Sequence, residues 1–201
     1  LSGSTDNGPI SRIYKNEGDD LFTEMSFPFP NLESGAVAWG DYDNDGDLDI
    51  LLSGMMSYQN YFTYIFKNAG DFDFNLISTP NIPYLRKSSV AWGDYDKDND
   101  LDILISGSSS TEDICNVYKN MGNDTFSALA EFSVSGDYGT VEWADFNNDG
   151  YLDILFAGQN NFNSEIYIYL NQANDTFINI SNLELRSEER RVGKECRSRW
   201  S

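Results

Sequence analysis

The stretch VAWGDYDNDGDLDILLSG, residues 37–54, decides the fold because the chain repeats it. A second copy, VAWGDYDKDNDLDILISG, spans residues 90–107, and a third, VEWADFNNDGYLDILFAG, spans residues 141–158. The tryptophans of the three copies are 53 and 51 residues apart. A period of this length is typical of repeat architectures, in which each repeat forms one supersecondary unit that packs against the next.

A second motif, built around a Lys-Asn or Leu-Asn pair, follows each copy and also stands near the start of the chain. Its four copies are RIYKNEGDDLF from Arg12, YIFKNAGDFDF from Tyr64, NVYKNMGNDTF from Asn116 and IYLNQANDTF from Ile168. Residues 1–3, LSG, match the end of the first motif. The sequence therefore holds three whole repeats and a partial repeat before them.

Each repeat contains four short segments with the pattern of β-strands. Residues 37–39 lead into an acidic loop, and the apolar run 49–53 leaves it. Residues 61–67 are aromatic and β-branched, and residues 72–77 alternate between apolar and polar. No helical periodicity is sustained, and continuous apolar runs of this length are typical of strands covered on both faces. We therefore predict an all-β fold, a partial β-propeller of four-stranded antiparallel blades.

The repeats also predict the domain boundaries. We expect a partial blade over residues 1–35 and blades with an acidic loop over residues 36–88, 89–139 and 140–185. Propellers typically close with 4 to 8 blades, so about three and a half repeats correspond to a fragment of a propeller.

The last stretch, RSEERRVGKECRSRWS over residues 186–201, differs from the rest in composition. It holds 6 of the 13 basic residues and lacks strand or helix periodicity. It resembles the translation of a sequencing-library adapter over its whole length. We interpret it as a non-native tail that is dispensable for folding.

Charge limits the classes of partner. The chain has 33 acidic and 13 basic residues and no histidine, which gives a net charge of −20. Such a charge repels nucleic-acid phosphates and anionic lipids. No segment approaches the ~20 apolar residues of a membrane span, so we expect neither nucleic-acid binding nor membrane insertion. Metal cations are the natural partners.

The acidic loop after each tryptophan predicts a metal site. Its spacing, D-x-D-x-D-G-x-x-D, brings alternate carboxylates to one point, and two such charges about 4 Å apart repel by roughly 4 kcal/mol at an intermediate dielectric constant. Ca²⁺ fits best, since it accepts six to eight oxygen ligands in flexible geometry, whereas transition metals favour His or Cys. The candidate ligands are Asp41, Asp43, Asp45, Asp47 and Asp49 in the first loop, Asp94, Asp96, Asp98, Asp100 and Asp102 in the second, and Asp145, Asn147, Asp149, Tyr151 and Asp153 in the third.

The turn residues and charges of the loops lead to two further expectations. Gly46 and Gly150 supply a positive φ, and Asn99 tolerates the same left-handed conformation. The first two loops each have four ligand carboxylates, but the second has Asn99 at the turn and the positive charge of Lys97 beside the site, and the third loop has only three. Calcium affinity should therefore fall from the first loop to the second and then the third. An EF-hand is disfavoured because the twelfth loop position lacks the required Glu and the flanking segments are β-rich.

The repeated motif W-[GA]-D-[YF]-[DN]-x-D-[GN]-x-L-D-I-L resembles the FG-GAP/VCBS repeat, which forms the blades of integrin α-subunit propellers. The resemblance covers residues 1–185, although the Phe-Gly and Gly-Ala-Pro elements that name the family are not literally present. It implies a seven-bladed propeller with calcium in the loop that joins the first two strands of a blade.

For function, we expect a non-enzymatic, calcium-binding interaction or adhesion module of a secreted or cell-surface protein, periplasmic or on the outer surface if bacterial. Its ligand would be a protein or a carbohydrate. The chain has no His for general-base work and no G-x-S-x-G or P-loop motif, so we assign no catalytic residue. The alternative is the propeller or carbohydrate-binding part of a polysaccharide-acting enzyme whose catalytic residues lie elsewhere.

Other single residues carry weaker expectations. Recurrence at one strand position favours packing over sugar stacking for Trp39, Trp92 and Trp143. Cys115, in an apolar strand, is expected to be a buried thiol. Three asparagines open N-x-[ST] sequons that are candidates for glycosylation: Asn123, Asn174 and Asn179.

Overall fold

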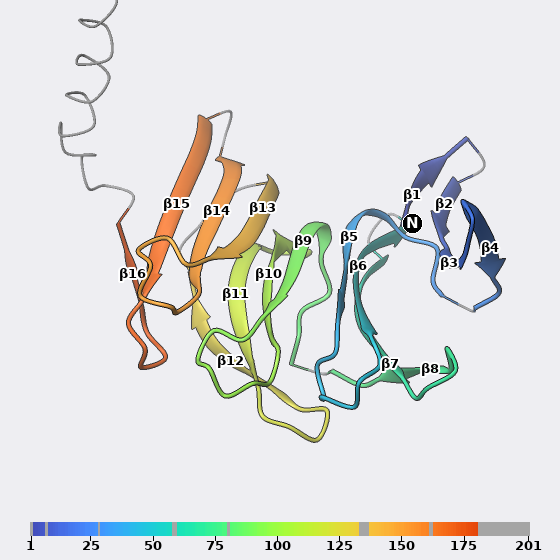
Figure 1. The fold of residues 1–201 in the computed structure, drawn as a ribbon. Helices are drawn as coiled ribbons and strands as arrows, with labels where there is room; N and C mark the ends of the chain where they lie inside the picture. The colour runs from blue at the N-terminus through green and yellow to red at the C-terminus, as the bar shows by residue number, and fades with distance from the viewer. Residues whose placement is uncertain are drawn as a thin grey trace, which may run out of the picture.

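The computed structural model is all-β, as the repeats predict. Sixteen strands form antiparallel sheets, and the described part of the chain contains no helix (Figure 1). The tail 186–201 lies outside the described residues. The structure describes residues 2–6, 8–27, 29–57, 60–79, 81–132, 137–160 and 163–180.

Three of the sheets are four-stranded meanders, and each contains one copy of both motifs. The first blade consists of β5 (Glu33–Gly40), β6 (Asp49–Ser57), β7 (Asn60–Asn68) and β8 (Phe74–Ile77). The second blade consists of β9 (Arg86–Gly93), β10 (Asp102–Ser108), β11 (Asp113–Asn120) and β12 (Phe126–Glu131). The third blade consists of β13 (Asp137–Ala144), β14 (Asp153–Asn160), β15 (Asn163–Asn171) and β16 (Phe177–Asn179).

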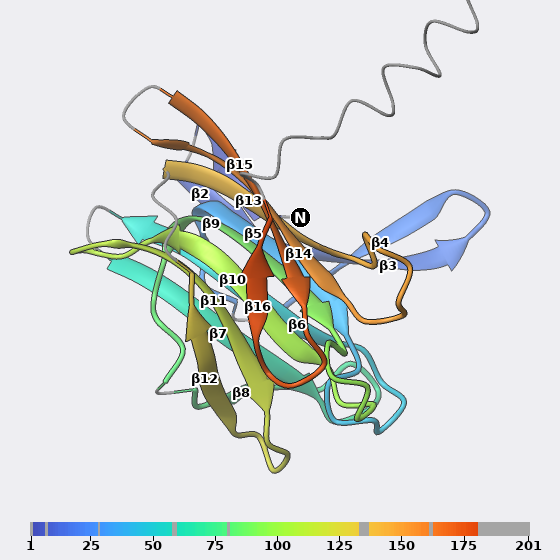
Figure 2. The same ribbon diagram turned by 90° about the vertical axis from the view of Figure 1, so that its left-hand side faces the viewer.

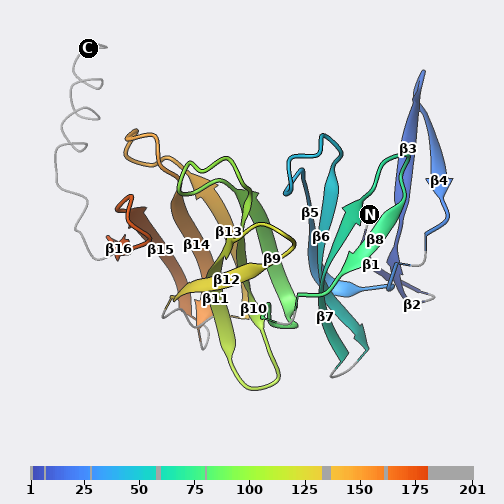
Figure 3. The ribbon, with the colours of Figure 1, turned by 90° about the horizontal axis from the view of Figure 1, so that it is seen from below.

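A smaller unit precedes the first blade. It contains two hairpins, β1 (Ser2–Thr5) with β2 (Gly8–Ser11) and β3 (Ile13–Gly18) with β4 (Leu21–Met25). The hydroxyl Oγ of Ser11 accepts a hydrogen bond from the backbone N–H of Leu32 (3.1 Å), which ties this unit to the first blade. Figures 1 and 3 show the unit and the three blades side by side in chain order, the arrangement of a partial propeller.

The blades are held together by apolar side chains on both faces of their inner strands. In β10, Ile103, Leu104 and Ile105 are fully buried. Ile103 and Ile105 belong to the cluster between the first and second blades, whereas Leu104 belongs to the cluster between the second and third blades. Successive side chains of a strand point to opposite faces, so one apolar run contributes to two cores. The prediction of strands covered on both faces is confirmed for β6 and β10, whereas in β14 the side chain of Leu155 is 39% exposed.

The tyrosine at the second position of the first and second acidic loops packs into the following blade. The ring of Tyr42 stacks on Trp92, with centroids 5.6 Å apart and an interplanar angle of 6°. Its hydroxyl donates to Oδ1 of Asp124, in the outer hairpin of the second blade (2.6 Å). Tyr95 repeats the contact one blade later, on Trp143 (6.1 Å, 7°) and Asp175 (2.8 Å). We call each set of contacts a Tyr–Trp seam.

The tryptophans therefore act mainly in packing. Trp143 is 9% exposed beneath Tyr95, whereas Trp39, which faces the N-terminal unit, is 48% exposed. Trp39 lines a pocket with Arg12 and Phe29. The expected packing role is confirmed for the second and third tryptophans, and the first is only half covered.

Glycine is required where a tryptophan crosses the preceding strand. A Cβ atom placed on Gly40 would lie 2.7 Å from Cδ1 of Trp92, and one on Gly93 would lie 2.6 Å from Cδ1 of Trp143. The corresponding residue of the third blade is Ala144. The glycines thus permit the close approach of neighbouring blades.

We predict that Gly93→Ala destabilises the protein by about 1–3 kcal/mol, because the added methyl group forces Trp143 away from the strand. Gly3→Ala is the matched control, since a Cβ there meets no atom within 4 Å. The measurement is urea denaturation followed by tryptophan fluorescence. Equal stability of the two variants would show that Trp143 does not require this close approach.

Candidate metal centre

The three acidic loops connect the first and second strands of the blades. They span residues 41–48, 94–101 and 145–152. Figure 2 shows all three loops at the same end of the molecule. The repeat therefore places the same chemistry at three successive positions along one rim.

The aspartate that opens each loop shapes its turn. Oδ1 and Oδ2 of Asp41 accept hydrogen bonds from the backbone N–H groups of Asp45 and Gly46, both at 3.0 Å. Asp94 and Asp145 make the same pair of contacts at 2.9–3.1 Å. The turn is therefore closed locally, by hydrogen bonds from the loop backbone to its own first side chain.

Two residues in each loop are left-handed. The sixth positions have φ values of 94° at Gly46, 74° at Asn99 and 88° at Gly150, which confirms the expected turn. The fourth positions are also left-handed, with φ values of 60°, 66° and 60° at Asn44, Lys97 and Asn148. This second left-handed position was not predicted, although two of its three residues are asparagine, which tolerates positive φ.

The aspartate that closes each loop is buried and joins two strands. Asp49 is fully buried and accepts hydrogen bonds from the backbone N–H groups of Tyr42 (3.1 Å) and Asn68 (2.8 Å). Asp102 and Asp153 do the same in their own blades. The ninth loop position therefore fixes the start of the loop against the end of the third strand.

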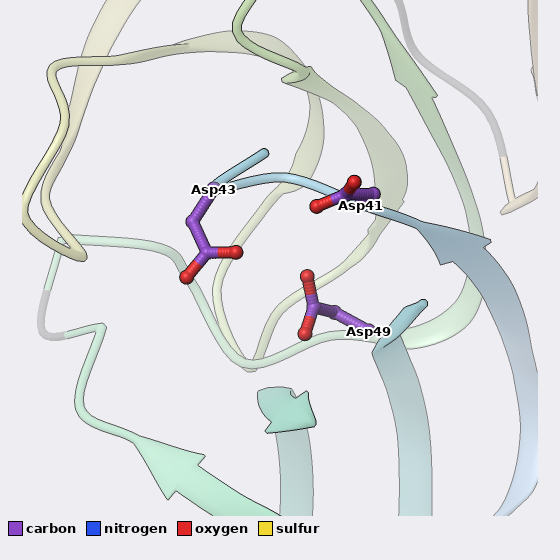
Figure 4. Close-up of side chains that lie close together, drawn as sticks. All are labelled: Asp41, Asp43 and Asp49. Carbon is purple, nitrogen blue, oxygen red and sulfur yellow. The ribbon is translucent and has the colours of Figure 1, made fainter. Parts of the chain in front are cut away.

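Carboxylates converge in the first two loops. Asp41, Asp43 and Asp49 each offer an oxygen within 4.8 Å of the other two, and Figure 4 shows the three side chains turned toward one another. In the second loop the same trio is formed by Asp94, Asp96 and Asp102.

The third loop is built differently. Among the described residues, no three of its carboxylates meet the same distance limit. Its third-position residue is Asn147, whose amide Nδ2 donates to Oδ2 of Asp149 (2.8 Å). The amide oxygen Oδ1 of Asn147 in turn accepts the backbone N–H of Asp149 (2.9 Å), so the third position of this loop offers no carboxylate.

Burial affects the two central carboxylates. It is the main cause that raises the pKa of Asp49 to about 6, with a smaller contribution from the neighbouring carboxylates of Asp43 and Asp45. Burial likewise raises the pKa of Asp102 to about 7. The backbone N–H donors act in the opposite direction, and a nearby cation would also favour the ionised forms.

Two lysines that the loop spacing does not predict reach into these trios. Nζ of Lys67 forms an ion pair with Oδ2 of Asp43, while the buried Oδ1 of Asp43 has no hydrogen-bond partner in the structure. Nζ of Lys119 pairs with Oδ2 of Asp96 in the second loop. The hydrogen bonds to these aspartates raise the pKa of both lysines. The recurrence of Lys-Asn in the second motif was the sequence feature that could have indicated a shared role for these lysines.

The remaining predicted ligands lie outside the trios. The fifth-position aspartates, Asp45, Asp98 and Asp149, are exposed and accept the N–H of the residue two positions on. Asp100 accepts a hydrogen bond from Nδ2 of Asn44 in the first loop (2.9 Å). At the seventh position of the third loop, Tyr151 lies under Nζ of Lys97, 3.8 Å from its ring centroid. The exposed fifth positions remain available to an approaching cation.

Other predicted residues also have clear environments. Cys115 is 1% exposed, and burial raises the pKa of its thiol to about 12, which makes it unreactive at neutral pH. Asn123 and Asn174 are exposed in outer hairpins, and Asn179 is exposed in β16. Their glycosylation stays a prediction.

Comparison with known families matches this architecture. The model of the FG-GAP-like repeat covers residues 1–52 and 106–156, which is half of the chain. The chain belongs to the FG-GAP-like repeat family. A search of curated proteins found no match. Within the described residues of this FG-GAP-like chain, no helix has the length and apolar character needed to cross a membrane.

We predict that Asp49→Ala destabilises the calcium-free protein by about 2 kcal/mol or more, because it leaves two buried N–H groups without their acceptor. Asp45→Ala, at an exposed position of the same loop, should cost less than about 1 kcal/mol. Urea denaturation in the presence of a chelator measures both. If both variants lose a similar free energy of unfolding, the ninth-position aspartate does not stabilise the loop through its buried hydrogen bonds.

Proposed function

We propose that this FG-GAP-like chain is a calcium-binding, non-enzymatic interaction module of a secreted or cell-surface protein. The observation that carries the proposal is the convergence of three carboxylates in each of the first two loops. In the first of them, one buried oxygen, Oδ1 of Asp43, has no hydrogen-bond partner. A cation would supply the missing interaction, since a buried polar atom without a partner is costly.

The donor set suits Ca²⁺. Every side chain of the two trios is an aspartate, and the described residues contain no histidine and one buried cysteine. Hard oxygen donors favour calcium or magnesium over softer transition metals. A loop of consecutive turns can adjust its ligand distances, which favours the larger ion with the less strict geometry.

Calcium would act structurally in these loops. The loop tyrosine that follows Asp41 or Asp94 enters the next blade, so a cation that rigidifies the loop also fixes the seam between blades. The ion would be held by the first, third and ninth positions of the first two loops, and by the exposed fifth-position carboxylate.

The interaction role rests on the repeat family and on the surface chemistry. Propeller blades of this family present connecting loops at both ends, and one fold supports many ligands. We propose a protein or carbohydrate ligand. An extracellular setting follows from the affinity expected of such exposed loops, ~10⁻⁴ to 10⁻³ M, which suits calcium concentrations outside the cell.

We predict that calcium at ten times the dissociation constant stabilises the protein by about 1.4 kcal/mol per occupied site. The test is a thermal denaturation series of the full chain with CaCl₂, with MgCl₂, and with a chelator. The transition midpoint should rise with calcium, rise much less with magnesium, and fall back when the chelator is added.

The variants Asp41→Ala and Asp94→Ala, singly and together, assign the effect to the loops. Each should remove part of the calcium-dependent rise, and the double variant should remove most of it. A rise that persists in the double variant would locate the binding elsewhere and refute the proposed site.

A further inference from the structure

The ion pairs of Lys67 and Lys119 with the metal trios have a consequence beyond calcium binding itself. We infer that these two lysines are built-in counter-cations that lower the calcium affinity of the first and second loops while supporting the calcium-free fold. This inference rests on the proposed calcium function.

Backbone contacts hold each lysine at its loop. Lys67 directly precedes Asn68, whose N–H donates to Oδ1 of Asp49 (2.8 Å). Lys119 precedes Asn120, which donates in the same way to Asp102 (2.8 Å). The third strand of each blade therefore delivers an ammonium group to the same end of the sheet as the trio.

Each ammonium group takes one oxygen of the third-position aspartate. Lys67 pairs with Oδ2 of Asp43, and their side chains are 30% and 18% exposed. Lys119 pairs with Oδ2 of Asp96 and also lies 3.9 Å from Oδ2 of Asp98. These partly buried pairs are less screened by solvent than an ordinary surface ion pair.

The third loop lacks both members of the pair. Leu170 stands where the other repeats have lysine, and Asn147 stands where they have the third-position aspartate. The third strand therefore delivers no ammonium group to this loop, and the lysine that does lie beside it, Lys97 of the second loop, lies over the ring of Tyr151 instead of pairing with a third-position carboxylate. This joint replacement indicates that lysine and aspartate act as one unit in the first two loops.

Coulomb repulsion sets the direction of the effect on binding. A divalent ion at the trio would share Asp43 or Asp96 with an ammonium group and would be repelled by it. At a partly exposed site, removing one such positive charge should tighten calcium binding on the order of tenfold. Counting lysines as well as carboxylates, the affinities of the three loops should lie closer together than the carboxylates alone suggest.

The same charge has the opposite effect without calcium. The ammonium group offsets the mutual repulsion of the trio, so its loss should destabilise the calcium-free protein. A neutral variant should therefore bind calcium more tightly and yet melt earlier in chelator. A purely structural lysine would produce only the second change.

The test uses the full chain, labelled with ¹⁵N and titrated with CaCl₂. The amide signals of Gly46, Asn99 and Gly150 report on the three loops separately. Lys67→Met should tighten binding at the first loop about tenfold, and Lys119→Met should do so at the second. Lys15→Met is the matched control, because Lys15 has the same repeat position but pairs with Glu17 (2.9 Å).

A reciprocal variant guards against loss of folding. Leu170→Lys should weaken binding at the third loop by a similar factor without removing any lysine pair. Unchanged or weaker binding in Lys67→Met and Lys119→Met would overturn this inference alone, and weaker binding would show that the lysines orient the ligands instead. If the unmodified chain binds no calcium at millimolar concentration, the proposed function and this inference both fail.

Discussion

The buried carboxylate at the ninth position of each acidic loop is the interaction on which the rest of the structure depends. Asp49 links the N–H of Tyr42 to the N–H of Asn68, and thus joins the loop to the far strand of the blade. With that link in place, the tyrosine is aimed at the next blade and the lysine is aimed at the loop. Packing between the blades and the charge contacts within the loop therefore both depend on the ninth-position carboxylate.

Much of the fold could be predicted from the sequence because its evidence is periodic. The repeated Trp, the apolar run that starts at Asp49 and the turn at Gly46 each follow from local preferences that recur in three copies. Local signals of this kind agree with one another in a repeat protein, where each unit packs only on its neighbours. The convergence of Asp41, Asp43 and Asp49 was also foreseeable from spacing.

Contacts between motifs were not foreseeable from spacing. Nδ2 of Asn120 in the second blade donates to the backbone carbonyl of Tyr42 in the first blade (2.8 Å), although 78 residues separate them in the sequence. The pairing of Lys67 with Asp43 spans two motifs that the sequence presents separately. Local patterns define which residues share a strand, but the side-by-side placement of strand ends decides which charges meet.

The Tyr–Trp seam has a direction: in both seams the preceding blade supplies the tyrosine and the following blade supplies the tryptophan. A contact of this head-to-tail kind couples each unit to its two neighbours and to nothing farther away. Cooperativity of unfolding along the chain then depends on the coupling between neighbouring blades. Loss of the seam at Tyr95 would weaken the coupling of the third blade to the second, where the apolar cluster around Leu104 remains, and would leave the seam at Tyr42 intact.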